Sequence, residues 1–132
     1  MSHEFLQPPG WAAPKGYSNG VVASGRQVYL AGQIGWNESQ QLVGSRFAVQ
    51  FRQALQNIVT LLAQAGGRPE HLVRLTWFVT NLDEYRAEGK EIGAAYRDVI
   101  GRHYPPMSVV QVVSLVEQGA KVEIEATAVV PD

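Results

Sequence analysis

Two glutamates near residue 124 are the side chains whose type and spacing could most directly do chemistry. Glu123 and Glu125 stand two residues apart in KVEIEATAVV, where the alternation of apolar and polar residues is typical of a strand. Side chains two apart on a strand share a face, so the two carboxylates would lie close enough to serve acid–base work. An exposed polar face gives the same pattern, and the spacing alone favours that simpler interpretation.

The other candidate groups lack the patterns of known reactive sites. His3, His71 and His103 are far apart in the chain and lack metal-ligand spacing, so we expect exposed or loop histidines and no metal. Arg46 and Arg52 fit a solvated helix face. No phosphate-loop, dinucleotide or G-x-S-x-G motif occurs. With Cys 0, thiolate nucleophiles, disulfides and cysteine zinc sites are excluded.

Composition sets the class of protein that must position these groups. The 132 residues, 45% hydrophobic and 17% charged, predict a single domain over residues 1–132. The formal net charge of -1 provides no field that would attract nucleic acid or an anionic membrane. The first residues do not resemble a signal peptide, and no apolar run approaches about 18 residues. We therefore expect a cytoplasmic protein without a nucleic-acid or membrane partner.

Turn and helix signals divide the first half of the chain. Residues 1–16, with three prolines, are predicted to form an irregular arm. The stretches YSNGVVAS and RQVYLAGQI predict a β-hairpin around Gly25. Apolar residues at helical spacing predict an amphipathic helix from Ser45 to Ala65, ended by Gly66 and Gly67.

The second half repeats this order. HLVRLTWFVTN predicts a strand, and the residues after it predict one helix with Asn81 or Asp83 as its N-cap. Close packing is the expected reason for Gly89 and Gly93 inside that helix. MSVVQVVSLV and KVEIEATAVV are predicted to be two final strands on either side of the turn EQGA. The order predicts an α+β fold: a mainly antiparallel sheet with two helices packed on one face.

The sheet face without helices is predicted to be apolar in part. Val122, Ile124 and every second residue to Val130 should pack beneath the helices. MSVVQVVSLV has valines at both odd-numbered and even-numbered positions, so both faces of this predicted strand carry apolar side chains. The sheet face without helices therefore cannot be wholly polar. An apolar sheet face without helices usually meets another subunit, so we expect a homo-oligomer.

Five stretches together resemble the Rid family, also called YjgF or endoribonuclease L-PSP. They run from about Lys15 to Val130 and are YLAGQIG, ALQNIVTLLAQAGG, RLTWFVTNLDEY, YPPMSVVQVVSL and KVEIEATAVV. The resemblance implies a chorismate-mutase-like subunit in a homotrimer, with the sheets packed inward and ligand clefts between subunits. The best-known activity of the family is the hydrolysis of small enamine or imine acids, such as 2-aminoacrylate, to keto acids and ammonia. We expect no cofactor.

The resemblance also assigns site residues. It implies that Glu123 orders the attacking water in the cleft, as a catalytic residue. The residues that it places around the substrate are Tyr17, Ala31, Gly32, Gln33, Met107, Ser108 and Val109. Ala31 stands where the family often has serine.

Met107 is the main departure from the family pattern, because active members have an arginine there that holds the substrate carboxylate. A thioether has no charge and no strong donor. We expect the loss of this clamp to weaken carboxylate recognition by about two to four decades. Two functions stay open: an enamine/imine deaminase with a neutral or differently anchored substrate, and a non-catalytic trimer that binds a small metabolite. The sequence does not support the ribonuclease activity that one of the family names suggests. It predicts neither a basic groove for RNA nor a pair of histidines placed for acid–base catalysis.

Overall fold

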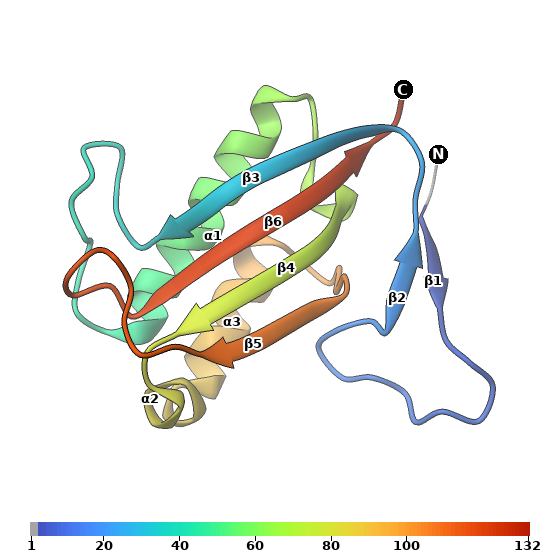
Figure 1. The fold of residues 1–132 in the computed structure, drawn as a ribbon. Coiled ribbons are helices and arrows are strands. Elements are labelled where there is room, and N and C mark those ends of the chain that lie inside the picture. Colours follow the sequence, from blue (N-terminus) through green and yellow to red (C-terminus); the bar gives the residue numbers. More distant parts are fainter. Residues whose placement is uncertain (1–2) are drawn as a thin grey trace.

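A four-stranded sheet is the centre of the computed structural model, which describes residues 3–132 (Figure 1). Its strands lie in the order β3 (Arg26–Ile34), β6 (Val122–Val130), β4 (Leu72–Val79) and β5 (Met107–Gln111). A second, two-stranded sheet of β1 (Glu4–Leu6) and β2 (Gly20–Val22) stands at its side. β6 pairs antiparallel with β3 and β4, whereas β4 and β5 are parallel.

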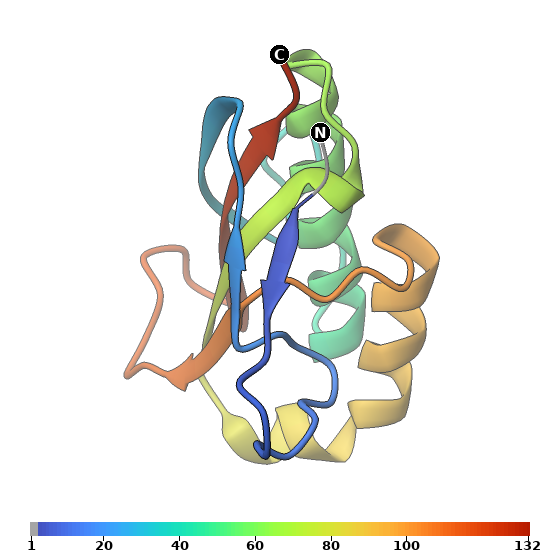
Figure 2. The ribbon, with the colours of Figure 1, turned by 90° about the vertical axis from the view of Figure 1, so that its right-hand side faces the viewer.

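The helices cover one face of the four-stranded sheet. They are α1 (Phe47–Gln64), α2 (Leu82–Ala87) and α3 (Gly89–Val99), with a 3-10 turn η1 (Pro69–His71) before β4. Turned by 90°, the molecule shows α1 and α3 on the same side of the sheet and no helix on the other (Figure 2). The predicted α+β fold, with a mainly antiparallel sheet and two long helices on one face, is confirmed.

The predicted first helix is confirmed to within two residues at each end. Most of its apolar stripe is buried, and Phe47, Phe51 and Leu55 are 0% exposed. Gly66 adopts a φ of 76°, the left-handed conformation that glycine supplies at a helix end. The Gly67 N–H donates to the Leu62 carbonyl at 3.0 Å, which closes the last turn.

The predicted face of the last strand is also confirmed. Val122, Ile124 and Ala128 are 0% exposed and join the core beneath α1, together with Leu75 and Trp77 of β4. Because alternate residues point to opposite faces, Glu123 and Glu125 lie on the face without helices.

The predicted hairpin around Gly25 is wrong. β2 pairs with β1, where Phe5 lies opposite Val21, and β3 pairs with β6 along nearly its full length. A nine-residue strand gains more hydrogen bonds and cross-strand contacts from β6 than from the three-residue β2. The predicted irregular arm is therefore also wrong at β1; Met1 and Ser2 of this arm lie outside the described residues.

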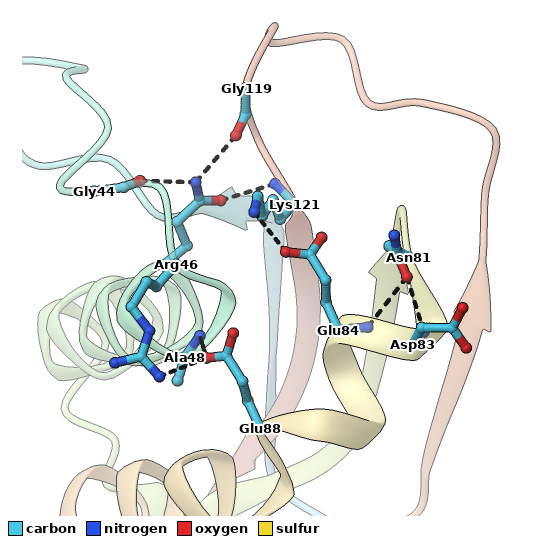
Figure 3. A network of polar contacts seen from close by, with 10 residues as sticks. Gly44, Arg46, Ala48, Asn81, Asp83, Glu84, Glu88, Gly119 and Lys121 are labelled. Carbon is cyan, nitrogen blue, oxygen red and sulfur yellow. Dashed lines mark hydrogen bonds and ion pairs between the residues drawn. The ribbon is translucent and has the colours of Figure 1, made fainter.

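The single helix predicted after β4 is in fact two helices that meet at Glu88. Asn81 is the N-cap, since its side-chain oxygen accepts from the Asp83 and Glu84 N–H groups at 2.9 and 3.1 Å (Figure 3). Close packing does not explain the glycines: a Cβ on Gly89 would meet nothing within 4 Å, and on Gly93 it would meet only the Arg97 guanidinium.

The last two strands do not lie on either side of a short turn, as was predicted. β5 ends at Gln111 and lies at the sheet edge beside β4, while β6 inserts between β3 and β4. Residues 112–121 form a long loop instead, and Val113 and Val116 in it are fully exposed. Within residues 3–132, none of the helices has the length and apolar composition needed to span a bilayer.

Candidate functional site

Glu123 lies over a bulge in β3. Leu30 and Gln33 pair with Ala126 and Ile124, so Ala31 and Gly32 form one extra step on the β3 side. A Cβ added to Gly32 would overlap the Glu123 carboxylate, with Cδ at 2.7 Å and Cγ at 2.8 Å. The half-buried Glu123 side chain therefore depends on a glycine at position 32 for its place.

The bulge also orders the chain beside this carboxylate. The Gln33 side-chain amide donates to the Ala31 carbonyl at 3.0 Å. Bulges are common beside functional sites because they re-aim side chains out of the regular ladder. Ala31, Gly32, Gln33 and Glu123 form a first group, at the β3 edge of the sheet.

Tyr17 belongs to a second group, at the Pro-Pro corner before β5. Its neighbour Ser18 donates its backbone N–H to the Pro105 carbonyl at 3.3 Å, and the Ser18 hydroxyl donates to the Tyr104 carbonyl. Ser18 also forms an isolated parallel bridge with Pro106. These contacts hold the chain next to the exposed Tyr17 at the corner before Met107, although 90 positions separate Tyr17 and Met107 in the chain.

The three predicted β5 residues point to different faces. Met107 pairs with Leu75 and Val109 with Trp77, and both side chains are half-buried against the core on the helix side. Ser108 lies between them on the open face and is exposed. The alternation in the sequence predicts that Met107 and Val109 share one face and Ser108 lies on the other. It does not predict which of the two faces is covered by the helices.

One chain does not bring the two groups together. Phe78 pairs with both Glu123 and Val110, so Glu123 is level with a residue three positions beyond Met107 and two strands away. With strands about 4.8 Å apart and a rise of about 3.3 Å per residue, Glu123 and Met107 are separated by roughly 14 Å. A site that used both groups would need two copies of the chain.

Comparison with known proteins decides the family. A family model described as Endoribonuclease L-PSP matches residues 9–130. The chain belongs to this family, the Rid family. The resemblance found in the sequence is thereby confirmed.

Relatives of this Rid chain include named deaminases. The chain is 30% identical over 122 residues to the human 2-iminobutanoate/2-iminopropanoate deaminase, covering 92% of this chain and 83% of that protein. It is 33% identical to Protein DfrA of Myxococcus xanthus, covering 89% of each. Among solved structures, the Rid family protein YyfB of Yersinia pestis has a TM-score of 0.86 at 31% identity, covering 98% of this chain and 100% of that one.

Gln50 is a polar residue that sequence reasoning missed. It is fully buried on α1, where its amide donates to the Gly44 and Gly119 carbonyls at 2.9 and 3.0 Å and accepts from the Lys121 N–H at 2.8 Å. Figure 3 shows these three backbone groups converging. The signal was available, because Gln50 stands within the apolar stripe between Phe47 and Phe51. It anchors the loop that leads into β6 and Glu123.

The histidines of this Rid chain gather around one hollow; His3 and His103 lie in loops as expected, whereas His71 lies in η1, contrary to the expectation. His71 is buried, and His103 lies near His3, with ring centroids 6.4 Å apart. Burial lowers the pKa of both His71 and His103. The His103 Nε2 lies 2.8 Å from the Leu72 carbonyl, and His71 Nδ1 accepts from the Arg68 N–H. Within residues 3–132, no three His, Asp or Glu side chains are placed to hold a metal.

Proposed function

We propose that this Rid protein hydrolyses small imine or enamine metabolites in clefts between three copies of the chain, with Glu123 as the residue that activates water. The observation that carries the proposal is the packing of the Glu123 carboxylate over Gly32 at the β3 bulge. A half-buried carboxylate held in place by a bulge is suited to general base work.

The need for more than one copy follows from the separation of the two groups. Tyr17 and Met107 lie at the β5 edge, and Glu123 and Gly32 lie toward the β3 edge. Packing of the open sheet faces would bring the β5 edge of one copy toward the β3 edge of the next. Exposed apolar side chains on β5 and its following loop, Val110, Val113 and Val116, favour such packing.

The reaction requires only water. Glu123 would accept a proton from a water molecule as its oxygen bonds to the imine carbon. Glu123 would pass this proton to the nitrogen, and the tetrahedral carbon would then lose the nitrogen as ammonia while its new hydroxyl gives up a proton to that nitrogen, leaving a carbonyl compound. The names of the deaminase relatives point to 2-iminobutanoate and 2-iminopropanoate as the first substrates to test.

Met107 favours a second candidate function, the binding of a small apolar metabolite without catalysis. Its side chain is half-buried against the core and offers no cation for a substrate carboxylate. A trimer that keeps the cleft but lacks a cation for the substrate carboxylate could bind a neutral ligand without releasing ammonia from it.

Ammonia release separates the two candidates. We expect freshly generated 2-aminoacrylate or 2-iminobutanoate to yield ammonia faster with the protein than without it. Glu123→Gln should lower that rate by about a hundredfold or more, the usual contribution of a general base. Gly32→Ala should do the same by displacing the carboxylate.

Glu125→Gln is the matched control, since Glu125 is exposed on the same strand and the same face. Its rate should equal that of the wild type. No ammonia above background from either substrate would reject the enzyme and leave the binding function. Equal losses in Glu123→Gln and Glu125→Gln would reject Glu123 as the base.

A further inference from the structure

A polar hollow of about 490 Å³ lies over α1, on the helix side of the sheet. Its walls are the outer face of α1 and the loop that follows β3, which Figure 1 shows between the end of β3 and the start of α1. Glu123 lies on the opposite face of the sheet and does not line the hollow. Gln33 is the one lining residue that belongs to the Glu123 group, and its amide is already bonded to the Ala31 carbonyl. The hollow is therefore a separate candidate for a ligand site.

One asparagine holds the loop over α1. The Asn57 side-chain amide donates to the Trp36 carbonyl at 2.9 Å and to the Ile34 carbonyl at 3.3 Å. Gln53 in turn donates to the Asn57 side-chain oxygen at 2.8 Å, which fixes the orientation of both amides. The walls of the hollow are thus in place before any ligand binds, which lowers the entropic cost of binding.

The α1 wall carries polar groups that the fold does not use. Its residues stand at helical spacing and are Gln53, Gln56, Asn57 and Thr60. Gln56 and Thr60 are exposed, and their side chains make no hydrogen bond within residues 3–132. Because Gln53 uses its NH2 group on Asn57, its carbonyl oxygen is left to accept a hydrogen bond. An amide both donates and accepts, as a hydroxyl does, so these groups match a ligand rich in hydroxyls.

Gln40, in the loop wall, has a backbone conformation that favours glycine. Within residues 3–132 it is the one residue other than glycine with a positive φ, at 59°. Its N–H donates to the Asn37 carbonyl at 2.9 Å, but its side chain makes no hydrogen bond to the part of the chain that the structure describes. Glycine would form the same turn without strain. Strained residues cluster at ligand sites, and a ligand would give the Gln40 side chain a contact that the fold does not.

The lining favours an uncharged ligand. Glu38 is its one ionisable residue, and this side chain is exposed. The half-buried Trp36 adds a flat apolar surface and an indole N–H. Side-chain amides beside an aromatic ring suit a sugar, which presents hydroxyls at the edge of its ring and C–H groups on its faces.

We propose that this hollow binds a neutral hexose, with the sugar ring against Trp36. The sugar hydroxyls bond to side-chain amides of the loop and of α1, those of Gln40, Gln53 and Gln56. The proposal does not depend on the deaminase function, because these four residues belong to neither group of the candidate site. It gives the chain a second ligand site, on the helix side of the sheet.

NMR titration of the isotope-labelled protein with D-glucose, D-galactose and D-mannose tests the proposal. At least one hexose should shift the Trp36 indole and Gln56 side-chain signals in a saturable way. Tetrahydropyran-2-methanol, which keeps the ring but has a single hydroxyl, should bind roughly tenfold more weakly or worse. Gln56→Leu should weaken binding of the hexose by roughly tenfold, through the loss of its hydrogen bonds. Gln40→Gly should also weaken binding without lowering the melting temperature, because glycine adopts a positive φ without strain.

Gln64→Leu is the control, since it removes an exposed amide of the same helix that does not line the hollow. Its affinity should equal that of the wild type. Glu123→Gln should also bind normally, which excludes binding in the proposed cleft. The absence of saturable shifts with all three hexoses, shifts centred on residues outside the lining, or equal affinities of the wild type, Gln56→Leu and Gln40→Gly would each overturn the proposal.

Discussion

At the scale of single residues, the expected effect of a substitution at Met107 depends on which face of the sheet its side chain occupies. Its side chain lies on the helix side of β5, with its stem against the core. A longer charged side chain at this position would have to bury its stem and carry its head out to the corner beside Tyr17. The sequence identified Met107 as the position of interest. Only its pairing with Leu75 shows that the Met107 side chain points to the helix side of the sheet.

Met107→Arg should create carboxylate binding. The guanidinium, partly desolvated, should lower the free energy of unfolding by about 1 to 3 kcal/mol. Pyruvate or 2-oxobutyrate should then raise the melting temperature of the variant and not that of the wild type, because only the variant gains an anion contact. Differential scanning calorimetry measures both effects.

Ser108→Arg provides the comparison, because it adds the same cation one residue later on the open face. Keto-acid stabilisation of Ser108→Arg as large as that of Met107→Arg would mean that position 107 has no special relation to a carboxylate site.

At the scale of elements, local patterns predicted what each segment is but not what it pairs with. The apolar stripe of α1, the alternation of β6 and the Asn81 cap depend on neighbours within a few residues. The partner of β2 and the parallel pairing of β5 depend on contacts made across the whole chain. The three-residue β1 was too short to give a signal.

The Gln50 contacts hold two loops to α1, and we expect them to stabilise the fold. Gln50→Leu would leave the Gly44 and Gly119 carbonyls and the Lys121 N–H without their Gln50 partners, lowering the free energy of unfolding by about 3 kcal/mol. Gln56→Leu, at an exposed position of the same helix, should change it by less than about 0.5 kcal/mol. Urea denaturation measures both; similar values for the two variants would contradict an anchoring role.

His103 makes stability depend on pH at the junction of η1, β1 and the β5 corner. Burial, opposed by the Leu72 carbonyl and by Glu70, lowers its pKa below the ordinary 6.5, with His3 adding to the decrease. The unfolded chain then binds more protons than the folded chain between the two pKa values, so stability falls as pH drops below about 6.5. Denaturation midpoints at about pH 7.5 and about pH 5.5 should differ less in His103→Asn than in the wild type. If the denaturation midpoints of His103→Asn at the two pH values differ as much as those of the wild type, or more, His103 is not a source of the pH dependence of stability.

At the scale of the whole molecule, the open sheet face and the loop after β5 are where copies should meet. Val113 is fully exposed in one chain, so Val113→Asp should leave the subunit intact and destabilise only the assembly. Light scattering should give a trimer for the wild type and a lower mass for the variant. Val49→Asp, on the helix side, should keep the wild-type mass. A wild-type mass of 14.5 kDa would rule out the proposed cleft.

The place of β6 in the sheet has a consequence for how the protein is made. β3 and β4 leave the ribosome early, but β6, which separates them, is not complete until residue 130 has been synthesised. Until then, both strands present unpaired edges beside the apolar stripe of α1, which is a state prone to aggregation. We therefore expect nascent chains stalled before β6 to be held by chaperones, and chains released after it to fold in one step.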